Sequence, residues 1–351
     1  MSAQLEAMEL RSSPHLPEKA GVETIMFNVV LALIPIVCFG IFLFGVSVIA
    51  LVATTTICCV LAEYLVCRCA NRASTIPDFS VVITGILLAL TLPPGFPLWM
   101  AAVGSLVAVF VGKAMFGGLG YNVFNPALVG RAFLQAAFPS AITTWTPAMS
   151  ADRFTAFIPS TLTLPFTRVQ PMDEWLRTAS IDGFSGATAL ALQKFDGIST
   201  NAGQLAMGFT AGSSGETSAV LILICGGYLA FRRMMDWRVP ASMLLAAFLT
   251  SAVFYMIDST QYPTPVFTLL AGGLMLGAVF MASDMVASPV TPLGVWIYGG
   301  LMGFLTVIIR LKGGLPEGVM YAILLGNAVS PIIDNLTQPR IYGAKSRRDT
   351  P

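Results

Sequence analysis

One apolar run, from Ile25 to Val66, most constrains the fold that this chain can adopt. It is about twice as long as the roughly 20 residues that one transmembrane helix needs, so it predicts two helices separated near Gly45. Apolar stretches recur along the whole sequence, which is 56% hydrophobic and only 11% charged. In soluble domains, about a quarter of the residues are charged. The sequence therefore predicts an all-α polytopic membrane protein that contacts the lipid bilayer.

Eight further segments have the composition of a membrane span, which gives about ten predicted transmembrane helices. Several are shorter than a bilayer requires, and this predicts tilted helices or broken helices buried inside a bundle. The segments are Val81–Leu92, Leu98–Val111, Ala127–Phe138, Ala219–Phe231, Ala241–Met256, Val266–Met281, Val295–Ile309 and Gly318–Ile333.

The two halves of the chain show the same order of features. In the first half, an apolar segment ends at TLPPGFP (91–97), a helix follows, and GGLGYNVFNPALVGRAFL (117–134) comes next. In the second half, ASPVTPLG (287–294) and GGLPEGVMYAILLGNAV (313–329) occupy the matching places. An odd number of spans separates the equivalents, so we expect two inverted five-helix repeats, as in many transporters. A chance match between common membrane motifs is the alternative.

The distribution of Lys and Arg predicts the orientation, because cytoplasmic loops carry an excess of these residues. Both termini are expected in the cytoplasm, and one long polar loop on the outer face. The predicted parts are an N-terminal arm (1–24), a first repeat (25–139), an extracytoplasmic loop (140–216), a second repeat (217–336) and a tail (337–351). A net charge of +1 gives no reason to expect nucleic acid as a partner. The single histidine, His15, and a lone Cys67-Arg68-Cys69 predict no metal site.

A motif in the polar loop carries the most specific chemistry. In DGFSGATAL (182–190), Gly186 and Ala187 leave the hydroxyl of Thr188 sterically open, although an ordinary turn is the alternative. The stretch resembles the flavinylation motif of the Rnf and Na⁺-translocating NADH:quinone reductase families, in which a flavin transferase joins FMN through its phosphate to a threonine. The resemblance implies a phosphoester of FMN on Thr188, with neighbouring contacts from Asp182, Ser185, Gly186 and Ala187.

The resemblance extends over nearly the whole chain and is strongest to the D subunit of the Rnf complex. It is carried by SSPH (12–15), VVITGILLALTLPP (81–94), GGLGYNVFNPA (117–127), GSSGETS (212–218), FMASDMVASPVTPLG (280–294), LPEGVMYAILLGNAVSPIID (315–334) and QPRIYG (338–343). Met285 and Gly326 depart from the usual family residues, proline and methionine. The chain begins about 25 residues before its first predicted helix, which favours this assignment over the longer B subunit of the quinone reductase.

The resemblance implies a bacterial inner-membrane subunit without catalytic side chains. It would relay electrons between ferredoxin- and NAD-linked partners while the complex moves Na⁺ or H⁺. The implied partners are the other Rnf subunits (A, B, C, E and G) and a flavin transferase. Two alternatives stay open, namely the quinone-reductase B subunit and a flavin-free solute channel or transporter.

Further candidate residues lie in or beside the apolar segments. Asn122 and Asn125 offer amides, and by resemblance a second, non-covalent flavin such as riboflavin could lie near them. Arg131 could neutralise a reduced flavin or pair with an acid of the other repeat.

Glu216 could lie at a helix start capped by Ser213 or Ser214, or contact a flavin near Thr188. Intramembrane acids are costly and often functional, so Asp284, Glu317 and Asp334 are candidates for an ion path. Asp284 is expected in an apolar helix, where it could coordinate a cation or bind backbone donors freed by the next proline.

Overall fold

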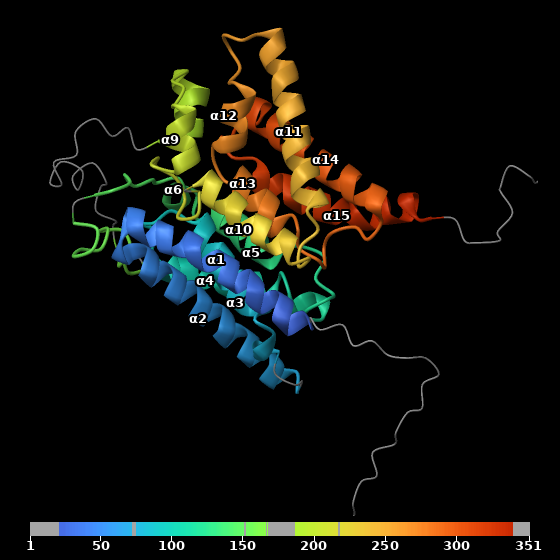
Figure 1. The fold of residues 1–351 in the computed structure, drawn as a ribbon. Coiled ribbons are helices and arrows are strands. Elements are labelled where there is room, and N and C mark those ends of the chain that lie inside the picture. Colours follow the sequence, from blue (N-terminus) through green and yellow to red (C-terminus); the bar gives the residue numbers. More distant parts are fainter. Residues whose placement is uncertain are drawn as a thin grey trace, which may run out of the picture.

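The computed structural model describes residues 21–71, 75–150, 152–165, 167, 187–216 and 218–339, and these residues form helices and no strand. Two long helices begin the fold, α1 (Val22–Phe44) and α2 (Val46–Cys69), and they lie side by side along one flank of the molecule (Figure 1). Gly45 separates them with a φ of 75°, and a Cβ there would lie 1.8 Å from the Arg153 carbonyl oxygen. The predicted break near Gly45 is thus confirmed, and close backbone approach requires the glycine.

Short helices complete the first half of the chain. They are η1 (Ile76–Asp78), α3 (Ser80–Thr91), α4 (Leu98–Phe110), η2 (Ala114–Phe116), α5 (Pro126–Ala137) and α6 (Pro139–Ile142). At 12 and 13 residues, α3 and α4 are only about 18–20 Å long, less than the roughly 30 Å of a bilayer core. Most side chains of α3 are buried, so it is a short helix inside the bundle, as the sequence predicts.

The part of the long polar loop that the structure describes contains short elements, α8 (Ala189–Ala191), η3 (Leu192–Asp196) and α9 (Ala202–Met207). The second half then has α10 (Ala219–Phe231), α11 (Arg238–Ile257), α12 (Pro265–Leu270), α13 (Leu274–Leu276), η4 (Gly277–Met281), α14 (Pro292–Lys312) and α15 (Val319–Thr337).

The predicted span Val266–Met281 is not one continuous helix. It is interrupted between α12 and α13, where Gly272 has a φ of 67°. Arg310 from α14 fills the break, since its guanidinium donates to the carbonyl oxygens of Thr268 (2.7 Å) and Ala271 (3.0 Å). These bonds satisfy carbonyl groups that lose their helical partners at the end of α12.

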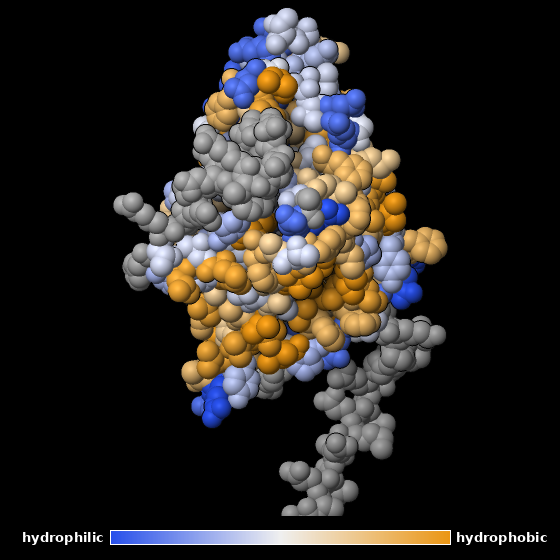
Figure 2. Space-filling view, turned by 90° about the vertical axis from the view of Figure 1, so that its left-hand side faces the viewer, coloured by the Kyte–Doolittle hydropathy of each residue, from blue (hydrophilic) through white to orange (hydrophobic). Residues whose placement is uncertain are grey.

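The halves of the chain pack internally and then against each other. α2 contacts α3 and α4, and α11 contacts α14, while α1 meets α10 and α5 meets α15 across the halves (Figure 1). Among the described residues, six helices are long and apolar enough to cross a membrane: α1, α2, the stretch Leu98–Phe116, α11, α14 and α15. Figure 2 shows a broad apolar band with hydrophilic residues above and below it. The fold is that of a polytopic membrane protein.

Candidate functional site

Thr188 lies at the start of α8 and caps it. Its Oγ1 accepts a hydrogen bond from the Ala191 amide at 3.2 Å, and the residue is only 4% exposed. The expectation of a sterically open hydroxyl is therefore wrong for this structure. The reason is that the next two residues, Ala189 and Leu190, pack into a small apolar cluster with α9 and α12, which holds the start of α8 in the fold. Ala187 is described, whereas Asp182, Ser185 and Gly186 lie outside the described residues.

The segment after Thr188 is fastened to the end of α14. The Lys194 ammonium donates to the carbonyl oxygens of Arg310 (2.7 Å), Gly313 (2.5 Å) and Leu315 (3.0 Å), and so caps that helix. Partial burial lowers the pKa of Lys194. Leu190, Lys194 and Arg310 line a pocket with an empty volume of ≈ 640 Å³. Arg310 is buried there, and its Nε has no hydrogen-bond partner. The Thr188 segment thus borders a recess with two cationic side chains.

A second polar site lies where the two halves meet. Arg131 of α5 forms an ion pair with Glu317, which lies two residues before the start of α15. The predicted pairing of Arg131 with an acid of the other half is confirmed. Glu216 lines the same pocket, which has an empty volume of ≈ 370 Å³, and its Oε2 accepts from the Ser213 amide at 3.5 Å.

The predicted cap of the helix after Glu216 is wrong. Ser218 caps α10 by accepting from the Leu221 amide at 3.2 Å, whereas Ser213 and Ser214 lie further from the helix start. The Ser214 side chain instead donates to the Leu92 carbonyl at the end of α3. Because the cap lies two residues after Glu216, the glutamate stands before the helix rather than in its first turn, and its side chain can enter the pocket.

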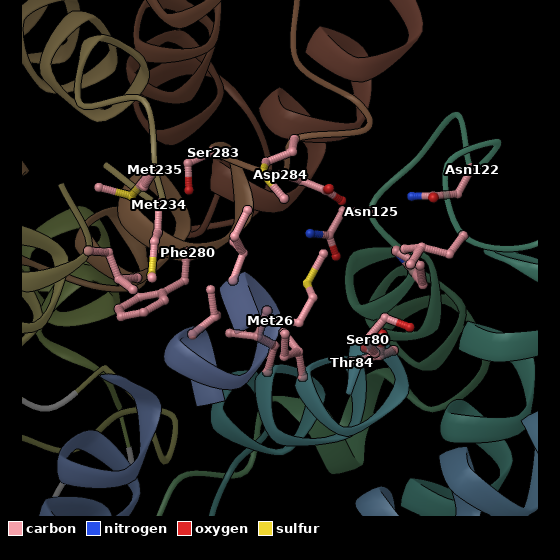
Figure 3. Close-up of a pocket in the computed structure, with 18 of the residues that line it drawn as sticks. Met26, Ser80, Thr84, Asn122, Asn125, Met234, Met235, Phe280, Ser283 and Asp284 are labelled. Carbon is pink, nitrogen blue, oxygen red and sulfur yellow. Dashed lines mark hydrogen bonds between the residues drawn. The ribbon is translucent and has the colours of Figure 1, made fainter. Parts of the chain in front are cut away.

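A third site is a pocket with an empty volume of ≈ 780 Å³ that contains three of the predicted residues, Asn122, Asn125 and Asp284. Asn125 caps α5, and its amide nitrogen also donates to the Met281 carbonyl of η4 at 3.4 Å. Figure 3 shows Asn125 and Asp284 facing the pocket from opposite halves of the chain, with Met26, Ser80 and Thr84 on another side. The buried Oδ1 of Asn122 has no hydrogen-bond partner.

Two of the predicted ion-path acids have local backbone roles. Asp284 follows η4 in a turn, so its predicted place in an apolar helix is wrong. Its carboxylate accepts from the Val286 amide at 3.1 Å, because the chain leaves helical geometry ahead of Pro289. Asp334, near the end of α15, accepts from the Val290 amide at 3.0 Å. It stabilises the segment that enters α14.

Sequence reasoning missed one buried ion pair beside the third site. The Lys113 ammonium lies 2.7 Å from the Glu63 carboxylate and 2.9 Å from the Ser80 hydroxyl, and both charged residues are under 5% exposed. Glu63 belongs to α2 and Lys113 follows α4, so no local pattern links them. Lys113 also lines the third pocket, so this ion pair borders the site.

One segment, residues 271–285, connects the three sites. Ala271 packs against Ala189 and Leu190, next to Thr188. Gly273, Gly277 and Met281 line the pocket of the Arg131–Glu317 pair, and Phe280 and Asp284 line the pocket of the asparagines. The Thr188 segment, the charged cluster and the asparagine pocket are therefore arranged in sequence along α13 and η4.

Comparison with known proteins gives matches over almost the whole chain. The NQR2, RnfD, RnfE family matches residues 9–343. The chain is 40% identical over 338 residues to the D subunit of the proton-translocating ferredoxin:NAD(+) oxidoreductase complex of Clostridium ljungdahlii, with 96% of each chain covered. It is 39% identical over 336 residues to the D subunit of the Na(+)-translocating ferredoxin:NAD(+) oxidoreductase complex of Acetobacterium woodii, with 96% of this chain and 95% of the relative covered. It is 36% identical over 349 residues to the D subunit of the ion-translocating oxidoreductase complex of Yersinia pseudotuberculosis, with 97% and 99% covered.

Proposed function

This chain belongs to the NQR2, RnfD, RnfE family, and we propose that it is a membrane subunit of an ion-translocating oxidoreductase that relays electrons through bound flavins. Its complex would couple ferredoxin- and NAD-linked redox chemistry to the movement of Na⁺ or H⁺. The observation that carries the proposal is the order of the three sites along the segment 271–285. Such a segment provides a short route through the protein between the Thr188 side and the asparagine pocket.

The environment of Thr188 fits a covalent FMN. The Thr188 oxygen serves the fold as a hydrogen-bond acceptor for Ala191, so esterification would replace a proton that the cap does not use. Lys194 and Arg310 lie in the adjoining recess and would compensate the negative charge of a phosphate or a reduced ring. Because Thr188 is buried, we expect the flavin transferase to act on the chain before this segment closes against α9 and α12.

The asparagine pocket fits a second, non-covalent flavin. A flavin ring offers polar edges and an apolar face, and the pocket offers amides from Asn122 and Asn125 beside apolar side chains. The unpartnered Oδ1 of Asn122 would gain a donor from such a ligand. Lys113 also lines this pocket, where its ammonium could donate to a ring edge, although its charge is compensated by Glu63.

The chain's own residues would bind, orient and electrostatically stabilise these groups, and they would perform no group transfer. Bound flavins supply one- and two-electron chemistry, which protein side chains lack. The apolar residues of α3 and η4 exclude water from the route between the sites. Substrate oxidation and reduction would then take place on partner subunits of the complex.

The packing of the helices supports two inverted five-helix repeats. Contacts between α2 and α4 and between α4 and α5 in the first half recur between α11 and α14 and between α14 and α15 in the second. This recurrence is what two repeats of five helical segments each would produce. We further propose that the loop bearing Thr188 lies on the outer face of the inner membrane, in the periplasm or its equivalent, and that the termini, which lie outside the described residues, are cytoplasmic.

Intact-protein mass spectrometry with peptide mapping tests the flavin assignment. The chain, co-expressed with its partner subunits and a flavin transferase, should gain the mass of one FMN ester on the peptide that contains Thr188. Thr188→Val should remove both this mass and the fluorescent band seen under ultraviolet light after denaturing electrophoresis. A wild-type chain with the mass of the bare polypeptide would refute the proposal and favour a flavin-free transporter.

A further inference from the structure

The charged cluster between the two halves contains a carboxylate that lacks an ion-pair partner. Arg131 is paired with Glu317, whereas Glu216 makes no ion pair with any cation among the described residues. Its Oε1 is buried without a hydrogen bond, and its Oε2 has only the 3.5 Å contact with the Ser213 amide. A carboxylate in this state within a membrane protein is costly unless it binds a cation or a proton.

Other unpartnered polar groups line the same pocket. Ser213 is 1% exposed and its hydroxyl has no hydrogen-bond partner, and the second carboxylate oxygen of Glu317, Oε1, also lacks one. Three oxygen atoms without partners therefore surround one small cavity with an empty volume of ≈ 370 Å³. Carboxylate and hydroxyl oxygens are ligands of hard cations, and they are also proton acceptors.

The two guanidinium groups near the pocket each bind another group, although the buried Nε of each has no hydrogen-bond partner. Arg131 is bound to Glu317. Arg310 interacts electrostatically with Glu216 and Glu317, but its two terminal nitrogens donate to the broken end of α12. The four charges sum to zero, and Arg131 and Arg310 attract Glu216 electrostatically, but among the described residues neither forms a direct ion pair with it.

We propose that Glu216, Glu317 and Ser213 bind one monovalent cation, either Na⁺ or a proton. The site deepens the proposed function and rests on it for its role, because it lies on the segment 271–285 between the two proposed flavin sites. An electron delivered by a ferredoxin-linked partner to a flavin at either end adds one negative charge. Uptake of one cation at Glu216 would balance that charge, and its release would follow when the electron leaves.

Relatives of this chain are named for different cations. One relative of this chain is named proton-translocating and another Na(+)-translocating, at 40% and 39% identity. Overall similarity therefore does not select the ion, whereas a compact site of three oxygen ligands can bind either one.

Gly273 provides a specific way to block the site. A Cβ added at Gly273 would lie 2.9 Å from Oε1 of Glu216, and the backbone there, with a φ of −71°, accepts alanine. Gly273→Ala should therefore displace the carboxylate without straining the chain. Gly300→Ala on α14 is the matched control, since a Cβ there meets no atom within 4 Å.

The test uses the purified complex in Na⁺-free buffer. Isothermal titration with NaCl, against choline chloride as a blank, should give saturable Na⁺ binding that weakens at least about tenfold in Glu216→Gln and Gly273→Ala, but not in Gly300→Ala. If the cation is a proton, Na⁺ binding is absent, and a protonated-carboxyl band in infrared difference spectra should disappear in Glu216→Gln.

Two controls keep the outcome interpretable. Each variant is first checked for monodisperse elution as an assembled complex, and Glu216→Asp serves as the conservative variant that should retain part of the affinity. Thr188→Val should lose covalent flavin and keep cation binding, so that failure of the flavin assignment and failure of this site are distinguishable. Na⁺ binding and a carboxyl band that are both unchanged in Glu216→Gln would overturn the inference.

Discussion

The buried pair of Glu63 and Lys113 allows a quantitative prediction about stability. Both residues are almost fully shielded, and the ammonium makes bonds of 2.7 Å to Glu63 and 2.9 Å to Ser80. Lys113→Met leaves the Glu63 carboxylate buried with only the Thr75 hydroxyl as a donor. Breaking a buried pair by removing one partner costs about 3–5 kcal/mol, because the remaining charge is uncompensated.

The double variant with Lys113→Met and Glu63→Leu distinguishes a mutually dependent ion pair from two independent losses of contacts. Glu63→Leu should cost about as much as Lys113→Met, since it leaves an unpaired buried ammonium. If the two losses were independent, the double variant would lose about 6–10 kcal/mol, the sum of two such costs. Removal of both charges instead leaves no buried ion, so we expect the double variant to be more stable than either single variant.

Free energies of unfolding in detergent micelles, followed by tryptophan fluorescence in a denaturant series, provide the measurement. Arg68→Met is the control, because Arg68 is exposed and its guanidinium bonds to the Tyr64 hydroxyl, and it should change stability by less than about 0.5 kcal/mol. Additive losses in the double variant, or single losses below about 1 kcal/mol, would refute the account of a buried and mutually dependent pair.

Three further changes test the packing and the loops. Gly303→Ala places a Cβ 2.2 Å from a backbone oxygen of α11 and should cost about 1–3 kcal/mol in thermal unfolding, whereas Gly300→Ala should be neutral. Thr188→Ser should keep both the cap of α8 and the fluorescent band. Thr188→Val should lose the band and reduce the local stability of α8 by roughly 1 kcal/mol, measured as faster amide hydrogen exchange in α8. Hydrogen bonds from Thr260 hold the pKa of Asp258 below its ordinary value. The carboxylate therefore stabilises the fold at neutral pH, and this stabilisation is lost as the pH falls through that pKa. The thermal unfolding temperature of Asp258→Asn should depend less on acid pH than that of the wild type.

The sequence was sufficient to predict where the main helices lie and to offer pairing with an acid of the other half as one of two roles for Arg131. Long apolar runs mark helices in any membrane protein, because the bilayer requires every backbone group to be bonded within the segment. Gly45 and the proline breaks likewise act through local backbone geometry. Both roles offered for Arg131 have a similarly general reason, namely that an unpaired charge in a bundle is too costly.

Local patterns did not predict the burial of Thr188 or the position of the helix interruption at Gly272. Both depend on residues from distant parts of the chain, since α9 and α12 bury the start of α8 and Arg310 holds the break open. The helical position of Asp284 was wrongly predicted for a related reason, because apolar composition does not reveal where a π-helical turn ends.

Composition and the lengths of the apolar runs alone determined the class of this protein, its membrane setting and the order of its helices, because these follow from the transfer of single segments into lipid. Only the tertiary structure decided which charges meet. It placed Glu216 beside the Arg131–Glu317 pair, and it arranged this cluster between the Thr188 segment and the asparagine pocket. Electrostatic contacts act over a few ångströms between residues far apart in the chain, and no spacing in the sequence encodes such distances.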